Sequence, residues 1–181
     1  MATITTERPR ARKLPQDQLR MPDWRAAGWT GIAGGGLFLA LELLLLPRTN
    51  GIPAGDFVNM VAAIVLGPSA LSEPAGGPFY NGVMAMAIHF SISLVYLHLL
   101  SIICYRRSLS SSCAIGLGFG IALYLLNFHV FTALFPWFVE ARGASSLAAN
   151  AAFGLFSAWL YKNLERSEPL IGDPSRLSLR P

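Results

Sequence analysis

The sequence predicts an all-α membrane protein with four transmembrane helices and a short re-entrant or interfacial helix between the first and second of them. Two observations support this fold class. The chain of 181 residues is 53% hydrophobic and only 13% charged, which is about half the charged share of an ordinary soluble domain. Four of its segments are also apolar over about 20 residues, the length with which a helix crosses a hydrocarbon core of roughly 30 Å. The chain therefore belongs to the membrane class.

Residues 1–25 form a polar, basic arm before the first apolar segment. The arm holds six Lys and Arg residues together with Glu7, Asp17 and Asp23. The apolar run that follows is longer than the core of a signal peptide, and no A-x-A cleavage site ends it. We therefore expect this run to stay in the protein as an anchor, with the arm in the cytoplasm.

Four segments are expected to cross the membrane: residues 26–46, 79–103, 113–135 and 144–160. The last segment is the shortest, and Trp159 and Tyr161 at its end are typical anchors at the level of the lipid headgroups. Together with their connections, the four segments form one transmembrane domain over residues 26–165. The tail, residues 166–181, contains several prolines and little periodicity, so we expect it to be flexible.

A fifth apolar run, residues 57–71, is too short to cross. Gly67 and Pro68 interrupt it after ten residues, and Pro53 and Pro74 flank it. A helix of this length either lies at the membrane surface or dips into the membrane and returns, with its irregular backbone against protein or water.

The distribution of Lys and Arg favours four spans. In that topology the arm, Arg106, Arg107, Lys162 and the tail share one side and carry twelve of the fourteen basic residues, while Arg48 and Arg142 lie on the other. If residues 57–71 also crossed, each side would carry seven. Cytoplasmic loops are enriched in Lys and Arg, so we expect both termini in the cytoplasm.

Small residues recur on one face of the expected spans. Helices in lipid associate through close packing at such positions, and a turn of about 3.6 residues brings these glycines onto shared faces. The predicted packing positions are Gly28, Gly31 and Gly35 in the first span, Gly116 and Gly120 in the third, and Gly154 in the fourth.

Strongly polar residues lie on the same faces. They are Glu42, His89, Asn127 and Asn150, with Tyr96 on the face of His89. Counted from the non-cytoplasmic ends, the first four lie about 6–15 Å deep. A carboxyl group is costly at that depth and needs a partner, and His89 is the nearest candidate for Glu42.

This polar cluster has two interpretations. In the structural one, its members hydrogen-bond to one another and fix the helix register. In the functional one, they line a small outward-facing pocket in which Glu42 and His89 exchange protons or hold a small cation. The sequence does not decide between them.

The remaining histidines do not extend the cluster. His98 follows His89 by nine residues and therefore faces the opposite side of the helix, and His129 lies about 160° round from Asn127. A haem held by His89 and His129 is accordingly a third and weaker hypothesis, and no C-x-x-C-H motif is present. We expect no cofactor and no metal. Because no phosphate loop, nucleophile elbow or zinc-protease motif occurs, we expect no enzyme.

Four stretches of the chain resemble a known family. They are "AAIVLGPSAL", "HFSISLVY", "GFGIALYLLNFHVFTALFPWF" followed by "ARG", and "AAFGLFSAWLYKNLE". The family is one of small uncharacterised four-span bacterial inner-membrane proteins, some of which carry an automated "sodium:proline symporter" label. The resemblance covers most of residues 24–165 and implies a location in the bacterial inner membrane. In that family an aromatic residue is common where this chain has His129, which argues against His129 as a shared ligand.

These observations lead to one main functional prediction and two alternatives. We predict a non-enzymatic accessory subunit in the lipid bilayer, packed against other membrane subunits or against a second copy of itself, with no nucleic-acid partner. The first alternative is a small ion or proton transporter, channel or pH sensor that uses the polar cluster. The second is a haem-binding electron-transfer subunit.

Overall fold

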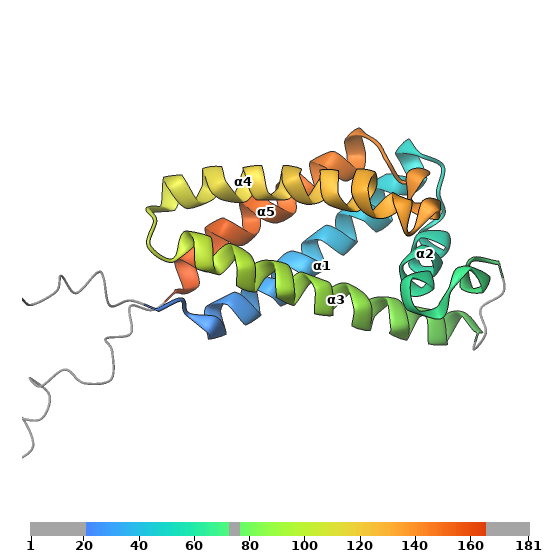
Figure 1. The fold of residues 1–181 in the computed structure, drawn as a ribbon, viewed down its shortest axis with the longest axis horizontal. Helices are drawn as coiled ribbons and strands as arrows, with labels where there is room; N and C mark the ends of the chain where they lie inside the picture. Colours follow the sequence, from blue (N-terminus) through green and yellow to red (C-terminus); the bar gives the residue numbers. More distant parts are fainter. Residues whose placement is uncertain (1–20, 73–76, 166–181) are drawn as a thin grey trace, which may run out of the picture.

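The computed structural model describes residues 21–72 and 77–165, which form helices and the turns between them. Four long helices lie side by side: α1 (Trp24–Thr49), α3 (Gly77–Cys104), α4 (Leu109–Leu125) and α5 (Ala144–Leu164). The shorter α2 (Ala54–Leu66) and the 3-10 helix η2 (Pro68–Leu71) cover one end of the bundle. The beginning of α1 and the end of α5 lie together at the opposite end (Figure 1). Residues 1–20 of the basic arm and all of the tail lie outside the described residues.

Three helical stretches are long and apolar enough to cross a membrane. They are α1, α3 and the continuous stretch Leu109–Ala133 that begins with α4. At about 1.5 Å per residue, α1 is about 39 Å long, which exceeds the hydrocarbon core of a bilayer. Over the described residues the all-helical prediction is confirmed, and these three stretches have the length and apolar character of membrane spans.

The first and third of these stretches begin at side-chain caps. The Asp23 carboxylate accepts a hydrogen bond from the backbone N–H of Ala26 at 2.9 Å, at the start of α1. The Ser108 hydroxyl oxygen accepts one from the backbone N–H of Ser111 at 3.3 Å, at the start of α4. Each cap satisfies an N–H group that has no partner within the helix.

Beyond α4 the chain changes its type of helix. A π-helix, η3 (Leu126–Val130), is followed by two short 3-10 helices, η4 (Phe131–Ala133) and η5 (Pro136–Val139). The Arg142 guanidinium donates a hydrogen bond through Nε to the Phe128 carbonyl at 2.8 Å and another to the Thr132 hydroxyl at 3.2 Å. The sequence predicts a regular span over residues 113–135 and misses this change. A π-turn alters the direction in which side chains point and is frequent at functional sites.

Three hydrogen bonds hold α2 and η2 against the end of the bundle. The Trp137 indole N–H donates to the Met60 carbonyl at 3.0 Å. The buried Asn81 amide donates to Asn59 Oδ1 at 2.9 Å and to the Ala70 carbonyl at 3.2 Å. At about 20 Å, α2 is too short to cross a membrane.

The closest helix contact joins α4 to α5. A Cβ atom added to Gly120 would lie 2.1 Å from the Asn150 carbonyl oxygen, and one added to Gly154 would lie 2.1 Å from the Gly116 carbonyl oxygen. A Cβ at Gly116 would lie 2.4 Å from the Gly154 carbonyl oxygen. These three predicted packing positions therefore let the two backbones touch.

Two of the three glycines predicted in the first span pack against α3, and the third does not. Gly31 faces Leu94 and Gly35 faces Ser93, both at distances that leave no room for a Cβ. Gly28 has no neighbouring atom within 4 Å of its Cβ position, so this side of α1 has no neighbour there, although Trp24 one turn earlier already stacks on His98 of α3. The expectation that Gly28 is a packing position is wrong.

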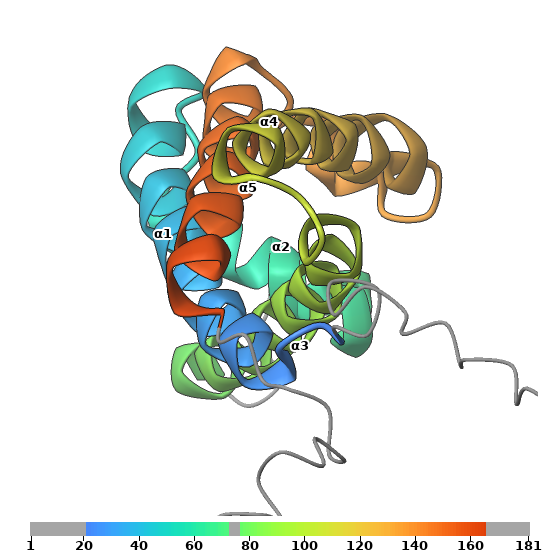
Figure 2. The ribbon, with the colours of Figure 1, turned by 90° about the vertical axis from the view of Figure 1, so that its left-hand side faces the viewer.

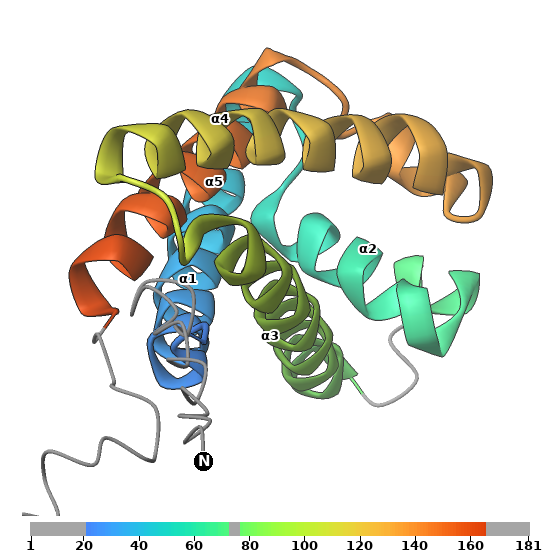
Figure 3. The same ribbon diagram turned by 60° about the vertical axis from the view of Figure 1, so that its left-hand side comes forward.

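Helix α3 lies apart from α4 over most of its length. The two helices are joined by a short turn at one end and diverge toward the other, as Figures 2 and 3 show. α1, α5 and α4 form one neighbouring set, and α2 lies between the distant ends of α3 and α4. The cavity of the candidate site has residues of α3 and of the segment after α4 in its wall.

Candidate functional site

A cavity of about 170 Å³ lies inside the bundle, with residues from α1, α2, α3, α5 and the end of α4 in its wall. An apolar cavity of about 150 Å³ is large enough to hold benzene. The wall is mostly aromatic. Its phenylalanines are Phe38, Phe57, Phe128, Phe131, Phe135, Phe138 and Phe153. The site is therefore an apolar chamber with room for a small ring.

We infer that the cavity opens to the outer surface of the bundle between α3 and η4, from the exposure of one lining residue on each. Ile92 on α3 is 39% exposed and Phe131 on η4 is 37% exposed, and both line the cavity. Figure 3 shows that α3 and α4 diverge on this side. We call the opening between Ile92 and Phe131 the mouth. Phe153 and Asn150, both buried, lie at the closed side.

Four of the five residues of the predicted polar cluster line this cavity: His89, Tyr96, Asn127 and Asn150. The Tyr96 hydroxyl donates a hydrogen bond to Asn127 Oδ1 at 3.2 Å. The Asn150 amide donates to the Ser146 carbonyl within its own helix at 2.8 Å. The cluster thus converges on one space, although its members do not form one continuous hydrogen-bonded chain.

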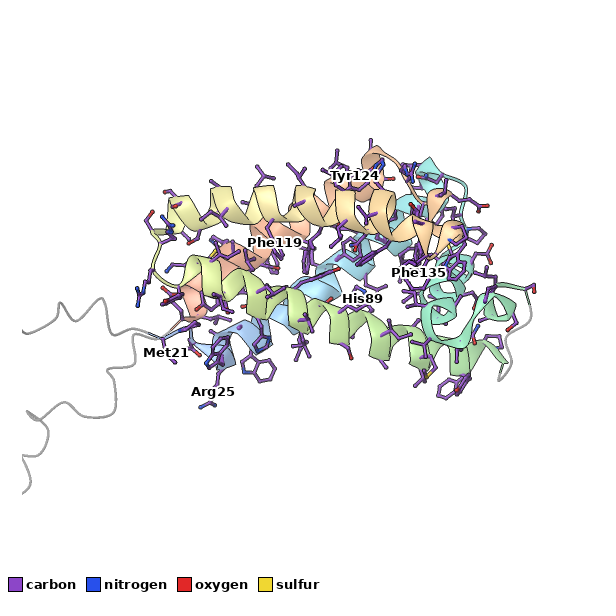
Figure 4. The ribbon with its side chains drawn as sticks, viewed as in Figure 1. Met21, Arg25, His89, Phe119, Tyr124 and Phe135 are labelled. Atoms are coloured by element: carbon purple, nitrogen blue, oxygen red, sulfur yellow. The ribbon has the colours of Figure 1, made fainter. Side chains whose placement is uncertain are left out.

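His89 lies midway along the bundle, whereas Phe135 lies at the end covered by α2 (Figure 4). The Nε2 atom of His89 is 2.8 Å from the carbonyl oxygen of Gly35. Because a carbonyl oxygen only accepts, Nε2 carries the proton and donates it. The Phe38 ring stacks on the imidazole, with ring centroids 5.8 Å apart and planes 8° apart.

Glu42, the fifth residue of the cluster, lies outside the cavity wall and is completely buried. The Ser146 hydroxyl donates to Glu42 Oε2 at 3.0 Å and also lies 2.8 Å from the Ala141 carbonyl. Glu42 Oε1 has no hydrogen-bond partner among the described residues.

The expectation that His89 is the partner of Glu42 is wrong. His89 bonds at the level of Gly35, seven residues before Glu42. Seven residues of helix are about 10 Å, too far for a hydrogen bond. The register between α1 and α3, which periodicity within each helix does not determine, gives each side chain a different partner.

The other two histidines lie outside the cavity wall. The His98 ring stacks on Trp24 with centroids 5.8 Å apart, and its Nδ1 donates to the Leu94 carbonyl at 2.7 Å. His129 is exposed on the outside of the bundle, where it contacts the ring of Tyr124. His89 and His129 therefore do not face a common space. Within residues 21–72 and 77–165, no three His, Cys, Asp or Glu residues are grouped to hold a metal ion.

The aromatic wall is the part of the site that the sequence analysis missed. A signal for it exists in the spacing of Phe128, Phe131, Phe135 and Phe138, which recur at intervals of three and four residues. Such a stripe predicts one shared helical face. The phenylalanines of the other helices carry no comparable signal, because apolar residues occur all round a membrane helix.

Comparisons with known proteins add no relative. No protein-family model, no curated protein and no solved structure matches the chain. The cavity and the polar residues in its wall are therefore the basis for assigning a function.

Proposed function

We propose that this protein is a non-enzymatic accessory protein of the bacterial inner membrane that binds a small apolar molecule between its helices. The observation that supports this function is the convergence of five polar side chains, Ser93 among them, and seven phenylalanines on one cavity. Small-molecule sites are typically concave and mostly apolar, with a few polar groups that orient the ligand. Binding at such a site requires no reaction at these residues.

The mouth gives the proposed ligand a route from the lipid. Ile92 and Phe131 border it on the outer face of the bundle, which in a membrane lies against acyl chains. A ligand that enters there is itself soluble in lipid. The volume fits a ring with a few further carbon atoms, and a longer chain would leave through the mouth.

We further propose that α5 is a fourth membrane span. Its 21 residues are about 31 Å long, which matches the hydrocarbon core. Its polar residues Ser146, Asn150 and Ser157 are buried against other helices, whereas Leu155 and Trp159 are exposed. Inward-facing polar groups therefore explain why α5 is less apolar than the other three helices. With four spans, α2 is an interfacial or re-entrant helix on the non-cytoplasmic side.

The topology can be tested with reporters at both ends of the chain. Four spans place both termini on one side, and the concentration of Lys and Arg there favours the cytoplasm. Green fluorescent protein should therefore fluoresce when it is fused to either terminus, and alkaline phosphatase should be inactive at both. With three spans the two ends would lie on opposite sides, and phosphatase at one of them would be active.

A variant that fills the cavity tests the binding function. Val61 on α2 lines the cavity and is 8% exposed. Val61→Phe should fill part of the chamber and weaken the binding of hexylbenzene at least about tenfold, or about 1.4 kcal/mol. Val65→Phe is the matched control, because Val65 is on the same helix, is 62% exposed and lies outside the wall.

Binding would be measured as the rise in the thermal unfolding midpoint of the protein in nanodiscs at increasing hexylbenzene content. The midpoint of each variant without hexylbenzene serves as the reference for its fold. We expect a saturable rise for the parent and for Val65→Phe. If the unfolding midpoints of both variants rise equally, hexylbenzene binds outside the cavity. If the midpoint of the parent does not rise, the proposal is refuted.

The arrangement favours this function over a proton or ion transporter built on Glu42 and His89. Glu42 bonds Ser146 and His89 bonds Gly35, so no proton passes directly between Glu42 and His89. Association with other membrane subunits, or with a second copy, is a further proposal about partners. The glycines between α4 and α5 already serve contacts within the chain, so a partner would meet the outer face of the bundle.

A further inference from the structure

We infer that the bound molecule is a quinol-type compound: a flat ring with a hydroxyl group at each of two opposite positions and an apolar tail. This inference rests on the proposed binding function and names the class of ligand for the same cavity. It follows from the hydrogen-bonding groups of the wall, from their separation and from the position of the mouth.

The wall offers one hydrogen-bond donor at the level of Tyr96. The Tyr96 hydroxyl donates to Asn127 Oδ1 at 3.2 Å, which fixes the orientation of the Asn127 amide. Its Nδ2 group, with two N–H donors, has no partner among the described residues. Because Asn127 lines the cavity, a ligand oxygen can accept from it.

The wall offers one acceptor at the level of His89. The proton on Nε2 is donated to the Gly35 carbonyl. A neutral imidazole with its proton on Nε2 has a free lone pair on Nδ1. No hydrogen bond to Nδ1 occurs within the described part of the chain. A ligand hydroxyl can donate to it, which an ether, a ketone or a hydrocarbon cannot.

The separation of these two groups favours a ring with two oxygens. His89 and Tyr96 are seven residues apart on α3, about 10 Å along the helix. The donor beside Tyr96 and the acceptor on His89 therefore lie at different levels of the cavity wall, about two helical turns apart. A flat ring meets both groups when it carries oxygens at opposite positions.

The surrounding side chains suit a flat ring and a tail. Phe38 and Phe153 meet edge to face, with centroids 5.9 Å apart, and aromatic walls of this kind favour a further aromatic ring. Ile92 at the mouth lies between His89 and Tyr96 in the sequence. The mouth is therefore at the level of the ring, so a tail attached to the ring can extend into the lipid.

Three probes with the same tail test the inference on the parent protein: hexylhydroquinone kept reduced with ascorbate, meta-hexylphenol and hexylbenzene. Each is titrated in nanodiscs with the thermal midpoint as the readout. We expect hexylhydroquinone to bind about tenfold more tightly than hexylbenzene, with the phenol between them, because each hydroxyl adds a hydrogen bond. Decanol serves as a flexible alcohol and should bind more weakly than hexylhydroquinone.

Two variants then assign the hydroxyl contacts. Asn127→Leu and His89→Phe should each weaken hexylhydroquinone binding about fivefold to tenfold relative to hexylbenzene binding measured on the same variant. Asn163→Leu is the control, because Asn163 is exposed and bonds within its own helix to the Trp159 carbonyl.

The outcomes separate this inference from the proposed function. If hexylbenzene binds the parent and hexylhydroquinone binds no better, the quinol inference is overturned and the apolar site stands. If decanol binds more tightly than hexylhydroquinone, the ligand is a chain rather than a ring, and the inference is again overturned. If none of the probes binds, the proposed function itself fails.

Discussion

Replacing Gly120 by alanine should lower the free energy of unfolding by about 3 kcal/mol. The added methyl group would lie 2.1 Å from the Asn150 carbonyl oxygen and 2.9 Å from its carbonyl carbon. Both atoms belong to the backbone of α5, so no side-chain rotation can relieve the overlap, and the two helices must separate. Separation also weakens the contact around Gly116 and Gly154, where the backbones touch as well.

Gly118→Ala is the matched control on the same helix. Gly118 is exposed and has no atom within 4 Å of its Cβ position. Alanine is a better helix former than glycine by about 1 kcal/mol, so this variant should be as stable as the parent or slightly more stable. Both variants would be unfolded thermally in the same detergent. Similar stabilities for Gly120→Ala and the parent would contradict the α4–α5 contact.

Replacing Arg142 by leucine should lower the free energy of unfolding by about 2–3 kcal/mol. Its guanidinium bonds the Phe128 carbonyl at 2.8 Å and the Thr132 hydroxyl at 3.2 Å. Hydrogen bonds from a charged donor are stronger than neutral ones. Without them, the Phe128 carbonyl of the π-turn lacks this side-chain donor, and a regular helix becomes more favourable there. Asn127 lies on the same π-turn, so its amide would turn away from Tyr96.

Arg48→Leu is the control for the loss of charge. Arg48 is exposed, lies at the same end of the bundle and bonds the Leu44 carbonyl of its own helix. Its replacement should leave the unfolding midpoint close to that of the parent. Arg142→Leu should lower that midpoint and also weaken hexylhydroquinone binding. If the two variants are equally stable, the Arg142 bonds do not hold the π-turn.

The sequence predicted the helices well because their length and apolar character follow from the solvent. Residues 26–46, 79–103 and 144–160 lie within α1, α3 and α5. The glycines between α4 and α5 were also predictable, since helices in lipid meet at small residues. The helical period likewise put His89 and Tyr96 on one face, and both line the cavity.

The parts that sequence reasoning missed depend on how helices are placed relative to one another. Periodicity gives the face of a residue on its own helix, but not the level at which a neighbouring helix meets it. For that reason the sequence predicts His89 as the partner of Glu42, whereas the hydrogen-bond partner of Glu42 is Ser146. The aromatic wall was missed for the same reason. The sequence around Phe38 and Phe153 does not distinguish them from phenylalanines that face lipid.

The position of a bound ring is the measurement that tests the central claim most directly. Crystals of the parent protein would be grown with para-bromohexylbenzene, and the bromine would be located by its anomalous scattering. If the ring binds in the cavity, one strong anomalous peak will lie between Phe38, Phe153 and His89, and Val61→Phe will show no such peak. Peaks confined to the outer surface of the bundle would contradict a binding site inside it.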